Sequence, residues 1–171
     1  MEIITKNSRE TQKLAATLAR RLVLKRATRV ACLGRRAVGK PKAVILALRG
    51  DLGAGKTTFI QGFARGLGIR EKILSPTFVI LKIFKITKRK TKSEKRKIKI
   101  QNLKYLYHID CYRVDNPKEI LELGFKEIIA NPENIVVIEW AERIRKILPK
   151  NAIWMKFEWI DKDKRRITIK N

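Results

Sequence analysis

Cysteine and long apolar runs are both scarce in this chain of 171 residues. Its two cysteines, Cys32 and Cys111, fit neither the spacing of a zinc site nor a disulfide framework. No apolar run approaches the ~18 residues that a membrane-spanning helix needs, and residues 1–6 lack the apolar core of a secretory signal peptide. The sequence therefore predicts a cytoplasmic protein that makes no membrane contact.

Acidic residues are also few, with 16 Asp and Glu against 41 Lys and Arg, which gives a net charge of +25. The excess is largest in residues 85–104, where ten Lys or Arg accompany a single acid, Glu94. Such a run is either a solvated loop or hairpin, or a surface that contacts a polyanion. We interpret it as a basic insertion in a single domain that spans residues 1–171. Residues 25–42 are also basic and are expected to be irregular, because they contain Gly34, Gly39 and Pro41.

A complete phosphate-binding loop motif, G-x-x-x-x-G-K-[ST], occupies residues 50–57. The apolar run Ala43–Leu48 before it predicts a strand, and residues 57–65 predict a helix, which is the context that the motif requires. Glycines let the backbone wrap a phosphate with its N–H groups pointing inward, at the positive end of the helix. Lys56 can reach the β- and γ-phosphates, and the Thr57 hydroxyl can ligate Mg²⁺. The motif predicts that the chain binds a nucleoside triphosphate.

Further elements follow from apolar periodicity and from capping residues. They are a helix opening at Asn7, strands at 105–110 and 135–139, a short helix between Asn116 and Gly124, and a closing hairpin of 153–159 with 167–169. Strands that alternate with helices predict an α/β fold, a three-layer P-loop NTPase-like domain. Its central sheet is expected to be mainly parallel, with an antiparallel edge.

Two carboxylates, Asp110 and Glu139, end predicted strands. A phosphate-loop enzyme needs a carboxylate near its magnesium, normally at the end of a buried strand. One of the two could hold Mg²⁺ directly or through water while the other orients or deprotonates the attacking water; alternatively, each caps the turn that follows it. His108 shares a strand face with Asp110. It either orients the metal site or is a hydrogen-bonded structural histidine.

These motifs together resemble the TsaE (YjeE) family of small bacterial ATPases, which take part in threonylcarbamoyladenosine synthesis on tRNA. The matching segments run in order through most of the chain: Gly50–Thr58, Ser75–Phe78, Tyr107–Arg113, Leu123–Gly124, Ile138–Trp140 and Leu148–Pro149. The phosphate loop alone is shared by very many proteins. The His-x-Asp-x-Tyr-Arg and Ile-Glu-Trp elements, in this order and at these separations, are far more specific.

The resemblance implies a single-domain ATPase with slow intrinsic turnover. Thr57 and Glu139 would ligate Mg²⁺, and Lys56 would be a catalytic residue. Asp110 would be the catalytic or metal-proximal carboxylate, and Ser75–Thr77 would form a switch-like loop that senses the γ-phosphate. The ATP-binding residues would be Gly53, Ala54, Gly55, Lys56, Thr57 and Thr58, with a further contact near Ser8, although helix capping explains Ser8 equally well. The implied partners are TsaB and TsaD, and hydrolysis would reset that complex for further turnover.

Two other functions remain open at this point. A small-molecule or nucleoside kinase would share the phosphate loop but would need an acceptor pocket and usually a lid carrying arginines. A nucleic-acid-binding module would explain the charge but not the specific motifs. The basic segments 25–42 and 85–104 look longer than the family pattern, and they are candidates for contact with tRNA.

Overall fold

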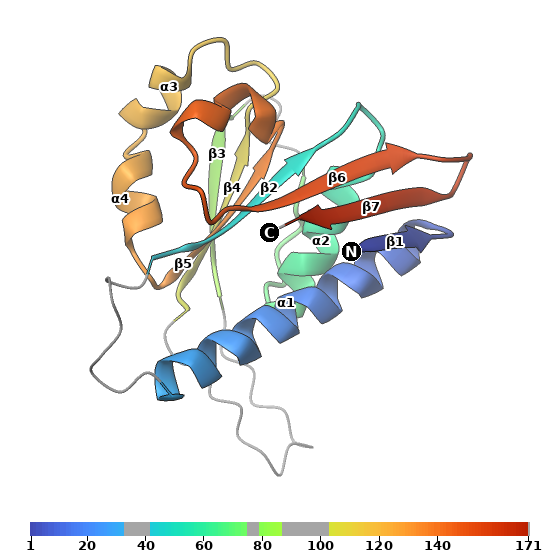
Figure 1. Cartoon of the computed structure of the whole chain (residues 1–171), viewed down its shortest axis with the longest axis horizontal. Coiled ribbons are helices and arrows are strands. Elements are labelled where there is room, and N and C mark those ends of the chain that lie inside the picture. The colour runs from blue at the N-terminus through green and yellow to red at the C-terminus, as the bar shows by residue number, and fades with distance from the viewer. Residues whose placement is uncertain (33–41, 75–78, 87–102, 171) are drawn as a thin grey trace.

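The computed structural model describes residues 1–32, 42–74, 79–86 and 103–170, with the backbone alone for residues 25–32. Within these ranges, seven strands form one sheet in the order β1-β7-β6-β2-β5-β4-β3 (Figure 1). In chain order the strands are β1 (Glu2–Thr5), β2 (Val44–Arg49), β3 (Leu81–Lys85), β4 (Tyr105–Asp110), β5 (Asn134–Glu139), β6 (Ile153–Trp159) and β7 (Arg165–Lys170).

The centre of the sheet is parallel: β2 pairs in parallel with β5 and with β6, and β4 pairs in parallel with β5. Both sides of the sheet end in antiparallel pairs, β3 with β4 on one side and β7 with β6 and β1 on the other. Every residue of β5 is buried, as expected for a strand covered on both faces. The predicted parallel sheet with an antiparallel edge is confirmed, and the antiparallel pairing occurs at both edges.

Helices cover both faces of the sheet (Figure 1). They are α1 (Ser8–Cys32), α2 (Lys56–Gly66), α3 (Pro117–Glu122), α4 (Phe125–Ala130) and the 3₁₀ helix η1 (Ala141–Ile147). One core lies under α1 and α2 and includes Phe59, Phe63 and Phe157. A second core lies on the opposite face and includes Ile120, Phe125 and Ile144 from α3, α4 and η1. This three-layer arrangement confirms the predicted P-loop NTPase-like fold.

Helix α1 is longer than the sequence suggested. Residues 25–42 were expected to be irregular, but the helix continues to Cys32, so that prediction is wrong for residues 25–32. Lysine, arginine and alanine are good helix formers, and no glycine or proline occurs in this part of the chain before Gly34. Residues 33–41, most of the basic run at 85–104, and the expected switch residues 75–77 lie outside the described residues.

Most of the other predicted elements are confirmed. Asn116 caps α3 in a complete capping box with Glu119, and Pro117 occupies the first helical turn. The hairpin of β6 and β7 forms as predicted, although β7 begins at Arg165. Strand β1 was not predicted, because a four-residue strand has little local signal and its partner β7 is far away in the sequence.

Two glycines bring α1 and α2 into backbone contact. A Cβ atom built on Gly66 would lie 2.6 Å from the Ala16 carbonyl oxygen, and one built on Gly62 would lie 2.7 Å from the Gln12 carbonyl carbon. Side chains at these two positions would force the helices apart. Close packing on α1 therefore fixes α2, the helix that follows the phosphate loop.

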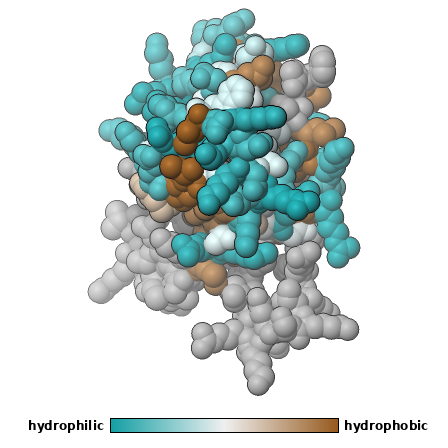
Figure 2. Space-filling model, turned by 90° about the vertical axis from the view of Figure 1, so that its right-hand side faces the viewer, coloured by the Kyte–Doolittle hydropathy of each residue, from teal (hydrophilic) through white to brown (hydrophobic). Residues whose placement is uncertain are grey.

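The described surface is mostly hydrophilic when the molecule is turned to show the right-hand side of Figure 1 (Figure 2). Apolar residues appear on that face as several separate groups among hydrophilic ones. No helix in the described ranges is both long enough and apolar enough to cross a membrane.

Candidate functional site

The phosphate-loop motif lies between β2 and α2, as predicted. Gly50, Gly53 and Gly55 have φ angles of 137°, 76° and 95°, values that residues with side chains rarely adopt. A Cβ atom on Gly50 would also overlap with the Phe157 carbonyl group of β6. Glycine therefore suits all three positions because of their backbone conformation, and at Gly50 there is also no space for a side chain.

Lys56, the first residue of α2, folds its side chain back over the loop. Its Nζ atom donates hydrogen bonds to the carbonyl oxygens of Gly50, at 2.6 Å, and Asp51, at 2.8 Å. The same atom lies 4.1 Å from the centroid of the Trp140 ring. Burial lowers the pKa of Lys56 below the ordinary lysine value, while nearby carboxylates, Glu139 first among them, act in the opposite direction. The loop thus holds a desolvated ammonium group at its centre, where an anionic ligand would interact with it strongly.

Thr57, Glu139 and His108 form one hydrogen-bonded cluster. The Thr57 hydroxyl lies 3.0 Å from each carboxylate oxygen of Glu139, so its single proton is shared between them. On the other side, His108 Nε2 lies 2.9 Å from Oε1 of Glu139. Glu139 ends β5 and His108 lies in the neighbouring strand β4. The cluster therefore links the start of α2 to the ends of two strands.

Asp110 ends β4 directly opposite Glu139 in the parallel pairing of β4 with β5. Its Oδ1 atom accepts a hydrogen bond of 3.0 Å from the backbone N–H of Tyr112, which is the turn-capping contact that the sequence left open as an alternative. The carboxylate is buried, and this contact fixes its orientation. The two predicted carboxylates therefore stand side by side at the carboxyl edge of the sheet, where α/β proteins bind ligands.

The chemistry of these side chains fits a magnesium ion. Mg²⁺ prefers oxygen ligands, keeps several waters, and is usually bound by one or two carboxylates together with substrate phosphates. Thr57 offers a hydroxyl oxygen and Glu139 a carboxylate, in contact with each other. The described residues contain no group of three or more His, Cys, Asp or Glu side chains arranged to hold a metal ion. The donors present match a cation shared between protein, water and phosphate.

Trp140 occupies an unusual backbone conformation beside the cluster. Its φ angle of 56° is the only positive value of a non-glycine residue in the described part of the chain. Its ring packs against Tyr112, with centroids 5.1 Å apart, and against the Lys56 ammonium group. Strained residues of this kind cost about 1–3 kcal/mol and cluster at functional sites.

Arg165 is a site residue that sequence analysis missed. Its side chain lies beside the phosphate loop, since a Cβ atom on Gly55 would be 3.7 Å from Arg165 Cγ. The guanidinium donates to backbone carbonyls of the β6–β7 turn, including that of Asp161 at 3.0 Å, and lies 5.3 Å from the Trp159 ring centroid. Only the order of strands in the sheet points to this residue. Because β6 runs parallel to β2, the β6–β7 turn lies at the same edge of the sheet as the loop after β2.

Ser8 is the first residue of α1, directly after the helix cap. The side chain of Asn7 accepts a 2.9 Å hydrogen bond from the Glu10 N–H, so Asn7 rather than Ser8 caps the helix. Three residues before Ser8, Thr5 lies opposite Arg165 in the β1–β7 pairing. This places the start of α1 on the Arg165 side of the loop, whereas Glu139 and Asp110 lie on the other side.

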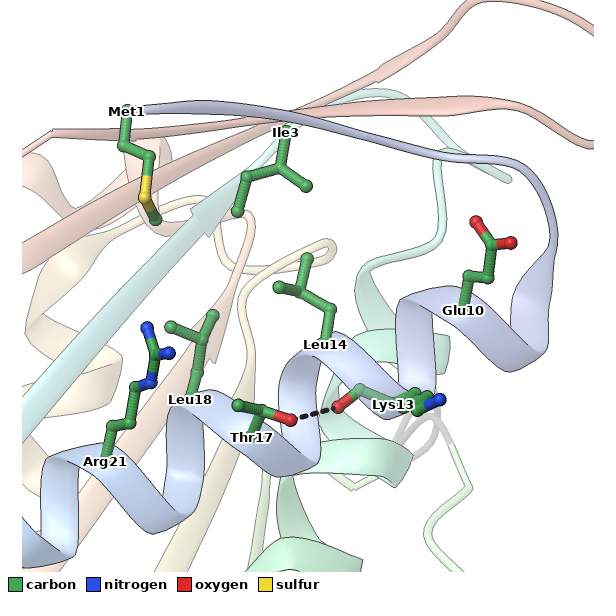
Figure 3. A pocket seen from close by; sticks show the side chains of 8 residues that line it. All are labelled: Met1, Ile3, Glu10, Lys13, Leu14, Thr17, Leu18 and Arg21. Carbon is green, nitrogen blue, oxygen red and sulfur yellow. Dashed lines mark hydrogen bonds between the residues drawn. The ribbon is translucent and has the colours of Figure 1, made fainter.

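A separate pocket of about 280 Å³ lies between β1 and α1 (Figure 3). Apolar side chains from both elements face each other across it, and charged side chains of α1 lie at its margins. It is lined by Met1, Ile3, Glu10, Lys13, Leu14, Thr17, Leu18 and Arg21. These residues include none of the candidate phosphate or magnesium ligands, so this pocket is distinct from the site at the phosphate loop.

Known proteins resemble the chain over most of its length. The sequence model of the family described as threonylcarbamoyl adenosine biosynthesis protein TsaE matches residues 5–167. The tRNA threonylcarbamoyladenosine biosynthesis protein TsaE of Rickettsia felis is 35% identical over 168 residues, covering 98% of this chain and 78% of the relative. The protein of the same name from Bacillus subtilis is 36% identical over 125 residues, covering 73% of this chain and 68% of the relative.

A solved structure agrees with these sequence matches. The crystal structure of Bacillus subtilis YdiB aligns with a TM-score of 0.62 and 29% identity, covering 99% of this chain and 83% of that one. Three of the segments that suggested the family, at 50–58, 107–113 and 138–140, meet around Lys56 and Glu139 in this chain. The family match, the relatives and the shared fold together show that the chain belongs to the TsaE family of threonylcarbamoyl adenosine biosynthesis proteins.

Proposed function

We propose that this chain binds MgATP at its phosphate loop and hydrolyses it slowly, in support of threonylcarbamoyladenosine formation on the tRNA adenosine next to the anticodon. The observation that carries the proposal is the direct contact between the Thr57 hydroxyl and the Glu139 carboxylate, 3.0 Å apart, beside the buried Lys56 ammonium group. Lys56 is thus placed to bind phosphate oxygens, and Thr57 and Glu139 next to it are placed to bind a divalent cation.

Each part of the loop has a separate role in binding. Backbone N–H groups of residues 53–58 would surround the phosphates, with the start of α2 adding the positive end of its dipole. Thr57 and Glu139 would hold Mg²⁺, which would neutralise part of the negative charge of the phosphates. Arg165 and the region of Ser8 lie on the opposite side of the loop, so the nucleoside would extend toward them.

Hydrolysis requires a water molecule to attack the γ-phosphorus atom. The water oxygen forms a new bond to phosphorus while the bond from phosphorus to the bridging oxygen breaks, giving ADP and inorganic phosphate. Asp110 would orient this water and accept its proton, because its carboxylate ends β4 next to Glu139. Lys56 would stabilise the negative charge that builds up on the phosphate oxygens. Slow turnover suits a protein whose hydrolysis step resets a partner complex.

The proposed partner is a complex of TsaB-like and TsaD-like proteins, of which TsaD transfers the threonylcarbamoyl group. Membership of the TsaE family supports this assignment, because the family is described by its part in threonylcarbamoyl adenosine biosynthesis. In this scheme the present chain hydrolyses ATP and does not carry out the transfer itself.

Replacing Glu139 with alanine tests the proposal. The variant should lose most Mg²⁺-dependent ATP hydrolysis but still bind ADP in the presence of EDTA, because the phosphate loop stays intact. A Glu122→Ala variant is the matched control, since Glu122 is an exposed acid at the end of α3. Normal hydrolysis by Glu139→Ala would refute the metal assignment. Transfer of labelled phosphate from ATP to a nucleoside or metabolite, in preference to water, would indicate a kinase instead.

A further inference from the structure

His108 is the buried partner of the carboxylate that we assign to magnesium. Its exposure is 0% and that of Glu139 is 3%. The Nε2–Oε1 distance of 2.9 Å is that of a well-formed hydrogen bond. A carboxylate that ligates Mg²⁺ is ionised and can only accept hydrogen bonds, so in the metal-binding state Nε2 carries the proton. The imidazole therefore donates to one particular oxygen of Glu139.

The second ring nitrogen of His108, Nδ1, argues against a role in core packing alone. Nδ1 is buried and has no hydrogen-bond partner within the described part of the chain. A buried polar atom without a partner carries a free-energy cost, so an apolar residue of similar size would suit a purely structural role better. The hydrogen bond between Nε2 and Glu139 is the contact that offsets this cost.

We propose that His108 is a positioning residue for Glu139, an inference that rests on the proposed MgATP site. By holding Oε1, the imidazole stops the carboxylate from rotating and leaves Oε2 available to the cation, while the Thr57 hydroxyl stays 3.0 Å from both oxygens. The Thr57 hydroxyl can keep donating its proton to the carboxylate while its oxygen lone pairs face the metal. Hydrogen-bond partners that orient a metal ligand in this way commonly change metal affinity 10–100-fold when removed.

Two substitutions of similar volume separate positioning from core packing. His108→Leu fills the space without a donor, whereas His108→Gln carries an amide N–H at about the reach of Nε2. The measurement is the Kd of Mn²⁺ for the protein–ADP complex, read from the electron paramagnetic resonance signal of free Mn²⁺. ADP affinity in EDTA and the thermal unfolding midpoint are recorded for each variant, so that a loss of folding is recognised.

If His108 positions Glu139, His108→Leu should raise the Mn²⁺ Kd at least ~10-fold and leave the affinity for ADP in EDTA unchanged. His108→Gln should retain most of the wild-type affinity for Mn²⁺. Equal Mn²⁺ affinity in His108→Leu and wild type, or equal weakening in both variants, would overturn the inference while leaving the proposed function intact. If His108→Leu does not fold, His108→Asn replaces it, because its shorter amide cannot reach Oε1. Failure of the wild-type protein to bind Mn²⁺ with ADP would overturn the proposed function and this inference together.

Discussion

Replacing Lys56 with methionine removes a buried positive charge and keeps the unbranched side chain that packs over the phosphate loop. The ammonium group donates two short hydrogen bonds, of 2.6 and 2.8 Å, to loop carbonyls, and it lies over Trp140. Its burial is unfavourable for a charge, as the lowered pKa of Lys56 indicates. Loss of the bonds and relief of the desolvation oppose each other, so we expect unfolding free energy to change by less than about 2 kcal/mol.

The effect on hydrolysis should be much larger than the effect on stability. An electrostatic donor aimed at charge that develops in the transition state is worth about 2.7–4 kcal/mol, or 10²–10³-fold in rate. The assay is steady-state phosphate release with saturating MgATP, compared with thermal unfolding of the same preparations. Lys72→Met is the control, because Lys72 is an exposed lysine after α2. A Lys56→Met rate within about threefold of wild type, a range far below the cited effect, would refute the assignment of Lys56 to the phosphates.

Three further predictions follow from the site and from the charge. Asp110→Asn should bind MgATP with unchanged affinity, measured by titration, yet hydrolyse it ~10²-fold more slowly, because an amide cannot accept the proton from water; loss of MgATP binding would instead make Asp110 a metal ligand. Amides of residues 73–80 should exchange hydrogen more slowly with a non-hydrolysable ATP analogue than with ADP, if the segment senses the γ-phosphate, and equal protection would rule out a switch. Neutralising six basic side chains of the 85–104 run with glutamine should weaken tRNA binding and flatten its dependence on salt, while leaving ATP hydrolysis unchanged; an unaltered salt slope would show that the run does not contact tRNA. The six positions are Lys88, Arg89, Lys90, Lys95, Arg96 and Lys97.

Local sequence signals were sufficient for the elements that build the site. Strand β4 was predicted with its observed bounds, and β2 and β5 to within one residue. In β2 and β5 the signal was a continuous apolar run, which marks a buried parallel strand. The end of α1 was not predicted, since the density of lysine and arginine was interpreted as a loop signal. Positive charge does not end a helix, whereas glycine and proline do.

Contacts between strands explain what the sequence could not predict in the site. Asp110 and Glu139 were expected to lie together, and the parallel pairing of β4 with β5 places them opposite each other. The hydrogen bond from His108 to Glu139 depends on that register and on side-chain rotamers, which have no local signature. Arg165 lies beside Gly55 only because β6 is the neighbour of β2. The order of strands in the sheet is a long-range property.

Because α1 packs tightly against α2, the two helices should move together as one rigid unit. Helix α1 has 25 residues and therefore a length of about 37 Å, and in Figure 1 its C-terminal part runs on beyond α2. Because Gly62 and Gly66 leave no slack between the two backbones, force applied at the far end of α1 reaches the helix that begins with Lys56 and Thr57. A ligand-gated or light-gated domain inserted into the chain after α1 would therefore be mechanically connected to the phosphate loop through the whole length of the helix.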